Sequence, residues 1–389
     1  MNLEELRDHG LNDAQRAIRH AAREFAKHEL APRVEEDEQA GRYPLDRMKR
    51  IGELGYLGAI VPPEYGGAGL DYASYGVICE EIAAADWVCA SVISVQNSLV
   101  GSGLLRFGTE EQKRRFLTPL ARGEWLASAC LTEPQGGSDL ASIRTTARRD
   151  GDHYVLDGEK AFISHANHAD LFLVLATIDP TLKQKGACAF LVRRDSPGIE
   201  ARPMALHVLR RGDHCLVHFD GVRVPADQLL GEEGGGFRIV GSALDVGRFS
   251  VASRCVGQAQ ACLDAALYYA GQREQFGQQL GRFQLVQGML ADMIASVEAA
   301  RLLVRRVGQL KDAGLERASF EASMAKLYAS DVCMKVAEQS VQIHGGYGLT
   351  AENPVGRYLQ EAKVLQIGEG SNQLHQALVA EYALGYRHM

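Results

Sequence analysis

The spacing of apolar positions changes twice along the chain. From Leu11 to about Trp125 they recur at the 3.6-residue period of a helix, as Ile18, Ala22 and Phe25 do. From about Ala127 to Glu232 the pattern is one of short apolar runs with turn residues roughly every ten positions, which is typical of a small barrel or sandwich. From about Gly236 long helical stripes return. The order predicts helices, then a β insert, then a helical bundle.

Individual elements can be assigned within this pattern. Asn12 or Asp13 is expected to cap a helix that ends before Pro32, and Thr109 with Gln112 has the spacing of a capping box. Asp157-Gly158 is expected to interrupt the strand run 153–164 with a turn. Further helices are expected over 72–85, 237–272, 283–313 and 318–344, further strands over 171–178, 187–194 and 214–225, and domains over 1–126, 127–235 and 236–389.

Composition narrows the class of protein. The 389 residues are 46% apolar and 23% charged, which excludes intrinsic disorder. The net charge of −7 makes nucleic acid or anionic lipid a poor partner. Eight cysteines lack CxxC spacing and are interpreted as reduced core thiols. The charged N-terminus does not resemble a secretory signal, and no apolar run has the length of a membrane span, so we expect a cytoplasmic protein.

One loop is a candidate for ligand binding. Residues 131–139, LTEPQGGSD, lie where helices give way to strands and contain two adjacent glycines among hydroxyl groups. Exposed backbone N–H groups in such a loop can hold a polar ring or a phosphate. Taken alone, the same residues are more typical of an ordinary surface turn.

Four further motifs follow this loop in order: EKAFISHANHAD, QREQFGQQLGRFQ, QIHGGYGLTAENPVGRYLQEAK and QIGEGSNQL. In sequence and spacing the five together resemble the acyl-CoA dehydrogenase family, over nearly the whole chain. The resemblance implies an N-terminal helical domain, a middle β-barrel and a C-terminal four-helix bundle. It also implies bound FAD, a homotetramer or dimer, an acyl thioester substrate and an electron-transfer flavoprotein as electron acceptor.

The reaction explains why a carboxylate is needed. Desaturating a thioester requires a base for the α proton and a hydride acceptor for the β hydrogen, and no side chain accepts hydride. Glu369, between two glycines, matches the family's usual catalytic glutamate, although an arbitrary glutamate there would be a loop carboxylate. Some relatives carry the base on the first C-terminal helix, where this chain has Gly247, so Glu369 has no visible rival.

The resemblance also implies contacts to cofactor and substrate, while each residue alone could be a cap, core or surface position. The flavin ring would lie against Leu131, Thr132, Ser138, Phe162 and Ser164. The rest of FAD would contact Arg273, Phe276, Gln284, Gln342, Gly345, Gly346, Ser371 and Gln373, the first three reaching a neighbouring subunit. The acyl thioester would contact Ser138, Leu244, Asp245, Arg248 and Gly370.

Two departures bear on the substrate. Gly368 replaces the tyrosine of many relatives, which would open space for a bulkier acyl group unless a neighbour fills it. The stretch from Trp87 to Asn97 has no charge where glutaryl-type relatives carry an arginine, which disfavours a dicarboxylate. His165 and His168 lack further ligands, so no metal is expected. Alternative functions are dehydrogenation of a carrier-protein-bound acyl group, a flavin oxidase or monooxygenase, and a non-catalytic flavin-binding protein.

Overall fold

The computed structural model describes residues 3–315 and 317–387. Contacts divide the chain into two compact units. We call residues 1–36, 71–90 and 248–389 the helical unit, and residues 37–70 and 91–247 the sheet unit. Each unit is assembled from separate stretches of chain. The division into three consecutive domains stays a prediction.

Helices dominate both ends of the chain. The N-terminal helices are α1 (Leu3–Asp8), α2 (Asp13–Phe25), α3 (Ala31–Ala40), α4 (Leu45–Glu53), α5 (Tyr72–Ala85), α6 (Trp87–Ser94), α7 (Ser102–Phe107), α8 (Glu110–Gln112) and α9 (Thr118–Ala121). The C-terminal helices are α10 (Gly236–Gln272), α11 (Gln284–Asp312), α12 (Ser319–His344), α13 (Val355–Ile367) and α14 (Asn372–Ala383). The expected long helices are therefore confirmed to within two residues at each end.

Strands occupy the middle of the chain, as expected. They are β1 (Ala127–Cys130), β2 (Thr146–Asp150), β3 (His153–Ser164), β4 (Leu171–Thr177), β5 (Ala187–Arg193), β6 (Ile199–Pro203), β7 (His214–Pro225) and β8 (Leu229–Leu230). A separate hairpin, β9 (Glu274–Gln275) and β10 (Gln278–Gln279), follows α10.

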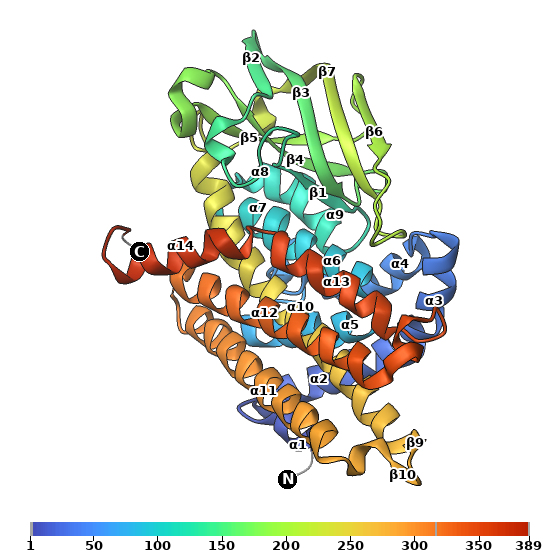
Figure 1. Ribbon diagram of the computed structural model, residues 1–389. Coiled ribbons are helices and arrows are strands. Elements are labelled where there is room, and N and C mark those ends of the chain that lie inside the picture. Colours follow the sequence, from blue (N-terminus) through green and yellow to red (C-terminus); the bar gives the residue numbers. More distant parts are fainter. Residues whose placement is uncertain (1–2, 316, 388–389) are drawn as a thin grey trace. The chain divides into compact units, whose positions relative to one another are not determined.

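The middle strands form one eight-stranded sheet in the order β6-β7-β3-β2-β4-β5-β8, with β1 pairing in parallel with β4 (Figure 1). Apolar side chains from β3, β4, β5 and β7 share a single buried cluster, so the sheet curls around a common core. Strand β4 is buried on both faces. Phe172 points into this core, whereas Leu171 and Leu173 pack on the cluster formed with α7 and α9. That double burial explains its uninterrupted apolar run.

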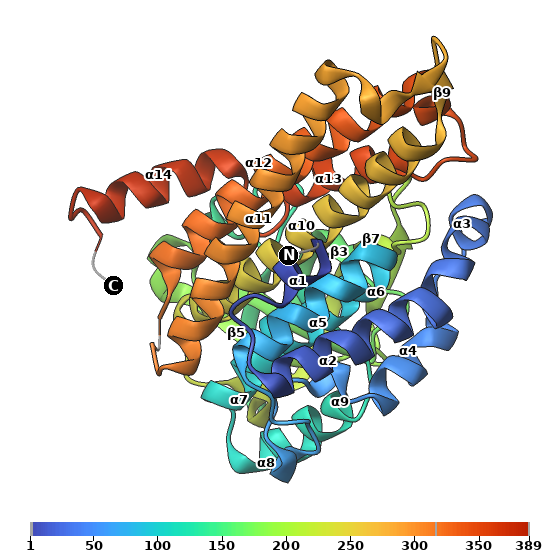
Figure 2. The same ribbon diagram turned by 90° about the horizontal axis from the view of Figure 1, so that it is seen from below.

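The helical unit is built around the long C-terminal helices. Helix α12 packs beside α11 and α13, and both views show these helices running alongside one another (Figures 1 and 2). The β9–β10 hairpin joins α10 to α11 at one end of the bundle. The sequence prediction of a C-terminal helical bundle is therefore confirmed.

Two local predictions were wrong. The first helix does not end before Pro32, because a π-helical turn over Ala26–Leu30 leads into α3 and Pro32 stands in its first turn, where no backbone N–H is needed. The pair Asp157-Gly158 is not a turn but a bulge within the continuous strand β3. The Asp157 carboxylate accepts from the Gly221 N–H at 2.7 Å, which holds β3 to the neighbouring β7 segment.

The predicted helix caps hold. Asn12 and Gln15 form a reciprocal capping box at the start of α2, and Thr109 and Gln112 form another at α8. The helical stretch Trp87–Phe107 is long and apolar enough to cross a membrane, but 89% of it is buried within the fold, as expected for a core helix.

Candidate active site

A strained three-residue loop carries the predicted base. Helix α13 ends at Ile367, and Ser371 caps α14 by accepting from the Leu374 N–H. Between them Glu369 has φ +53° and Gly370 has φ +101°. A left-handed backbone is uncommon for a residue with a side chain, and such positions cluster at functional sites. This backbone conformation fixes the direction in which the Glu369 side chain projects from the main chain.

The surroundings of the Glu369 carboxyl favour its protonated form. Its Oε2 atom is buried and has no hydrogen-bond partner. Burial raises the pKa of Glu369 to about 7, against the opposing effect of the Arg254, Arg248 and Lys326 cations. A carboxyl group with such a pKa can take a proton near neutral pH and give it up again.

Helix α12 holds the Glu369 loop from its C-terminal side. The fully buried Lys326 donates from Nζ to the Gly370 carbonyl at 2.7 Å and to Asn372 Oδ1 at 2.9 Å. Ser330 donates to the same Asn372 oxygen at 3.0 Å. Lys326 was not predicted from the sequence, although a lysine among the small residues of ASMAKLYAS indicates a closely packed position.

Helix α10 contributes two arginines near Glu369 in the helical unit. Arg248 is half-buried and lies 3.5 Å from Ser323 Oγ through Nη1. Arg254 is only 4% exposed and its guanidinium lies 4.4 Å over the Trp87 ring. The sequence analysis also missed Arg254, which lies two helical turns beyond Gly247 on the same face.

Leu244 and Asp245, predicted to contact substrate, stand on the part of α10 that belongs to the sheet unit. Asp245 is 2% exposed, and Leu244 is half-buried against the apolar cluster of Val240 and Leu175. Leu244 therefore has a packing role within its own unit.

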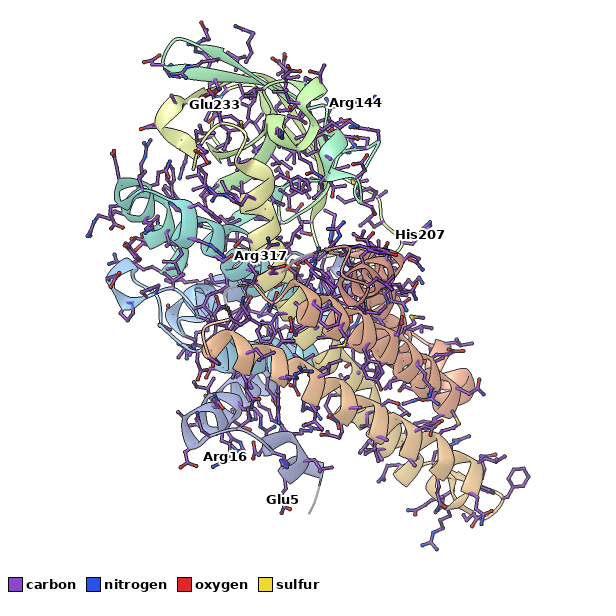
Figure 3. The ribbon with its side chains drawn as sticks, turned by 90° about the vertical axis from the view of Figure 1, so that its left-hand side faces the viewer. Glu5, Arg16, Arg144, His207, Glu233 and Arg317 are labelled. Atoms are coloured by element: carbon purple, nitrogen blue, oxygen red, sulfur yellow. The ribbon has the colours of Figure 1, made fainter. Side chains whose placement is uncertain are left out.

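In the sheet unit, a buried ion pair organises the loop that begins at Leu131. Lys160 Nζ donates to Glu133 Oε1 at 2.8 Å and to the Leu131 carbonyl at 3.1 Å. The Glu133 carboxylate also accepts from the Arg144 and Thr145 N–H groups at 2.7 and 2.9 Å, while the Arg144 side chain itself is exposed (Figure 3). Burial opposes ionisation of Glu133, but Lys160 and these bonds lower its pKa to about 2.

This arrangement limits what the loop can offer a ligand. The Leu131 carbonyl is taken by Lys160, and the Thr132 carbonyl accepts from the Ala161 N–H at 2.9 Å. The Glu133 and Gly136 N–H groups donate to each other's carbonyls at 3.1 and 3.0 Å, so the groups available to a polar ring are the remaining backbone N–H groups and the half-buried Thr132 hydroxyl. Ser138 lies in the exposed part of the same loop.

Strand β3 presents an aromatic ring next to this loop. Phe162 is 57% exposed and has φ +59°, at a bulge between Lys160 and Ile163. Bulges re-aim side chains next to functional sites, and a large apolar residue has no packing reason to be exposed there. Ser164 is half-buried, and its carbonyl accepts from Ser128 Oγ at 2.6 Å.

One pocket of about 410 Å³ lies within the helical unit. It brings together three residues predicted to bind the cofactor, Arg273, Gly345 and Gly346. A Cβ atom built at either glycine would meet nothing within 4 Å, so the backbone there is open to a ligand. The remaining lining residues are Tyr269, Gln275, Leu280, Ile343, His344, Tyr347 and Thr350.

This pocket fits the phosphate-bearing part of a dinucleotide. A guanidinium forks onto phosphate oxygens, and bare glycine backbone can approach them closely. The Arg273 guanidinium lies 5.5 Å from the centroid of the Tyr347 ring, and both residues line the pocket. The residues present are therefore compatible with a flavin dinucleotide.

The other predicted cofactor residues lie on exposed surface of the helical unit. Phe276 is 93% exposed at φ +55° in the two-residue turn of the β9–β10 hairpin, and Gln284 is exposed at the start of α11. Gln342 and Gln373 are exposed on α12 and α14. These side chains are directed at solvent in the single chain.

The two histidines of ISHANHAD have local partners. His165 lies 3.2 Å from both the Tyr43 hydroxyl and Ser91 Oγ, and His168 stacks on Tyr43 with ring centroids 4.0 Å apart. Within residues 3–315 and 317–387 no three His, Cys, Asp or Glu side chains are grouped as metal ligands.

Comparison with known proteins identifies the family. Residues 12–124, 128–222 and 234–384 match the N-terminal, middle and C-terminal domains of acyl-CoA dehydrogenase. The short-chain specific acyl-CoA dehydrogenase of Bos taurus mitochondria is 39% identical over 96% of this chain and 91% of its own.

Solved structures agree. Butyryl-CoA dehydrogenase from Megasphaera elsdenii superposes with a TM-score of 0.94 at 37% identity, covering 97% of this chain and 100% of its own. A glutaryl-CoA dehydrogenase from Mycobacterium smegmatis in complex with FADH2 superposes with a TM-score of 0.92 at 32% identity, covering 98% of this chain and 96% of its own. The chain belongs to the acyl-CoA dehydrogenase family.

Proposed function

We propose that this chain is an FAD-dependent acyl-CoA dehydrogenase that introduces an α,β double bond, with Glu369 as the base. The observation that carries the proposal is the Glu369 carboxyl, which is held on a strained loop with a buried, unpartnered Oε2 and a pKa of about 7. A base for a weakly acidic C–H needs such a raised pKa and a fixed direction.

The chain's own residues divide the work. Glu369 takes the α proton, and its backbone N–H donates to the thioester carbonyl, which stabilises the enolate as charge develops there. Lys326 keeps the loop in place through Gly370 and Asn372. Ser138, Leu244, Asp245, Arg248 and Gly370 are the proposed contacts to the rest of the thioester.

Two sets of residues would hold the cofactor. Leu131, Thr132, Ser138, Phe162 and Ser164 would contact the flavin ring, which supplies the acceptor for the β hydride when bound. Arg273, Phe276, Gln284, Gln342, Gly345, Gly346, Ser371 and Gln373 would contact the ribityl, pyrophosphate and adenine parts. The pocket around Arg273 and the bare Gly345 backbone support this assignment.

The electrons must then leave the enzyme, and we propose an electron-transfer flavoprotein or similar acceptor. A reducing compartment, with the cytoplasm as the simplest case, is supported by the eight cysteines, all of which are free and buried. The alternatives of a carrier-bound substrate or a flavin oxygenase are not favoured, because the related proteins named above are acyl-CoA dehydrogenases.

An anaerobic titration tests the proposal. Purified protein loaded with FAD is mixed with butyryl-CoA or with butyryl groups on an acyl carrier protein, and flavin absorbance is followed. We expect bleaching with the CoA thioester, and we expect Glu369→Gln to retain FAD but lose bleaching. Protein that takes up no FAD, or a Glu369→Gln variant that bleaches at the wild-type rate, would contradict the proposal.

A further inference from the structure

Arg254 differs from the other buried arginines of the helical unit in having no hydrogen-bond partner. Its Nε and Nη2 atoms are buried without a hydrogen bond, and no ion pair to it is present among the described residues. Two other buried arginines of the same unit each meet a carboxylate, Arg301 with Glu80 at 2.8 Å and Arg19 with Glu81 at 3.1 Å, and the half-buried Arg357 meets Glu361 at 2.8 Å. A buried charge without a partner is costly unless something binds to it.

Arg254 is not used to neutralise the base. Glu369 is the carboxylate that acts on it most strongly, yet the two form no ion pair, and Oε2 of Glu369 has no donor. Burial lowers the pKa of Arg254 and raises that of Glu369. A close salt bridge would have the opposite effect on both groups. The Arg254 guanidinium and the Glu369 carboxyl therefore lie near each other without a hydrogen bond between them.

The packing around Arg254 covers a face of its guanidinium and leaves the in-plane N–H groups available to a ligand. The Trp87 ring lies 4.4 Å from the guanidinium carbon and takes up one flat face. The charges of Arg254 and Glu369 both act on the Cys79 thiol of α5. Arg254 and Glu369 therefore lie in the same buried region of the helical unit. An in-plane pair of N–H groups is matched by the two oxygens of a carboxylate.

We propose that Arg254 binds a carboxylate on the acyl chain of the substrate, so that the enzyme acts on carboxylated acyl thioesters. The inference rests on the proposed function, because Glu369 as base puts the α carbon of the acyl chain in this neighbourhood. A scan for charge between Trp87 and Asn97 cannot detect this residue, since the guanidinium over Trp87 comes from α10. The proposal runs against the expectation from residues 87–97 that a dicarboxylate is disfavoured.

The test compares thioesters of equal chain length with and without a terminal carboxylate. Succinyl-, glutaryl- and adipyl-CoA are paired with butyryl-, valeryl- and hexanoyl-CoA, and kcat/KM is measured for the FAD-loaded wild type, Arg254→Met and Arg254→Lys. Arg306→Met, an exposed arginine on α11, is the matched control. Bound flavin per chain and the Tm show that each variant is folded.

For at least one pair, the wild type should prefer the carboxylated thioester. Arg254→Met should lower kcat/KM for that substrate about 10- to 100-fold more than for its uncharged partner, as expected for loss of a hydrogen-bonded charge, because a shift in the pKa of Glu369 acts on both substrates alike. Arg254→Lys should recover part of the loss, and Arg306→Met should leave kcat/KM unchanged for both thioesters.

Three results would overturn the inference. If the wild type prefers the uncharged thioester at every chain length, Arg254 does not bind a substrate carboxylate. Activity on the uncharged thioesters would still leave the proposed function intact. Equal losses on both members of a pair in Arg254→Met would assign the arginine to the base or to the fold. If no thioester of either series reduces the flavin, the proposed function itself fails, and the carboxylate subsite with it.

Discussion

At the scale of single residues, the proposed proton transfer depends on how charge is distributed around Glu369. Its carboxyl is deprived of hydrogen bonds while three cations, Arg254, Arg248 and Lys326, lie close enough to limit the rise of its pKa. Burial favours the protonated form and the cations favour the ionised form, and their balance leaves the pKa at about 7. Removing any one of these contributions should therefore shift the pKa of Glu369 in a known direction.

The pH dependence of flavin reduction follows from this balance. Because only the ionised carboxylate can accept the α proton, the rate of reduction by a saturating thioester should rise with pH through a midpoint near 7 and then level off. Removing the Arg254 charge should move that midpoint upward, since a nearby cation lowers a carboxyl pKa. Stopped-flow absorbance from pH 5.5 to 9 measures both, and a flat profile would be inconsistent with Glu369 as base.

Lys326 is a positioning residue rather than a catalytic one. In Lys326→Met the Gly370 carbonyl and Asn372 Oδ1 lose their charged donor, which should cost about 1–3 kcal/mol of unfolding free energy. The looser loop should lower kcat for flavin reduction more than it raises KM. Urea unfolding and steady-state kinetics measure the two effects. The exposed Lys335 on the same helix gives the control, Lys335→Met, and equal effects in both variants would rule out the positioning role.

At the scale of elements, two loops are fixed by buried lysines from neighbouring elements. Lys326 on α12 holds the loop of Glu369, and Lys160 on β3 holds the loop of Leu131 through Glu133. In each case a charged donor satisfies a backbone carbonyl at a turn that would otherwise be free to move. Both loops carry residues proposed to meet the reacting atoms.

Helices α5 and α10 pack closely against each other in the helical unit. A Cβ built on Gly257 of α10 would lie 2.0 Å from the Glu80 carbonyl of α5, whereas one on Gly271 of α10 would meet nothing within 4 Å. Gly257→Ala should therefore force the helices apart and cost about 1–3 kcal/mol of unfolding free energy. Gly271→Ala should leave that free energy unchanged or raise it by up to about 1 kcal/mol. Urea titrations compare them, and equal stability would argue against tight α5–α10 packing.

Element-level structure was largely predictable from sequence, because amphipathic period and capping residues are local. Helix α5 begins and ends where its pattern indicates, and the Thr109 box forms as expected. One failure was local, because Pro32 is accommodated by a π-helical turn directly before it, and the other was not, because Asp157 is held by a bond to Gly221 on the adjoining strand. Arg254 and Lys326 escaped notice because their roles depend on helix packing that no single segment encodes.

At the scale of the whole molecule, we propose that two exposed apolar residues of the helical unit mark a contact between subunits. Phe276 is 93% exposed at the tip of a hairpin, and Leu285 is 87% exposed at the start of α11. Phe276 also has a left-handed backbone, in a turn position that normally favours Gly or Asn. A large apolar residue held there at a conformational cost has a function beyond folding the single chain.

We expect Phe276 to contact another subunit in a homotetramer or dimer and to complete its cofactor site. Phe276→Asp should shift the molar mass in light scattering toward the monomer, because a charge at an apolar contact is desolvated on assembly. Flavin content should fall with the mass. Leu45→Asp, at an exposed apolar position on α4 that is 50% accessible, is the control and should leave the mass unchanged. A Phe276→Asp protein of wild-type mass and flavin content would contradict this assignment.

The most direct test of the central claim is exchange of the substrate's α hydrogen with solvent. A CoA thioester analogue with no transferable β hydrogen is incubated with the FAD-loaded enzyme in D2O, and deuterium at the α carbon is followed by NMR. We predict rapid exchange by the wild type and by Lys335→Met, and a loss of at least about 100-fold in Glu369→Gln, as expected for removal of a general base. Exchange at the wild-type rate in Glu369→Gln would show that another group takes the proton.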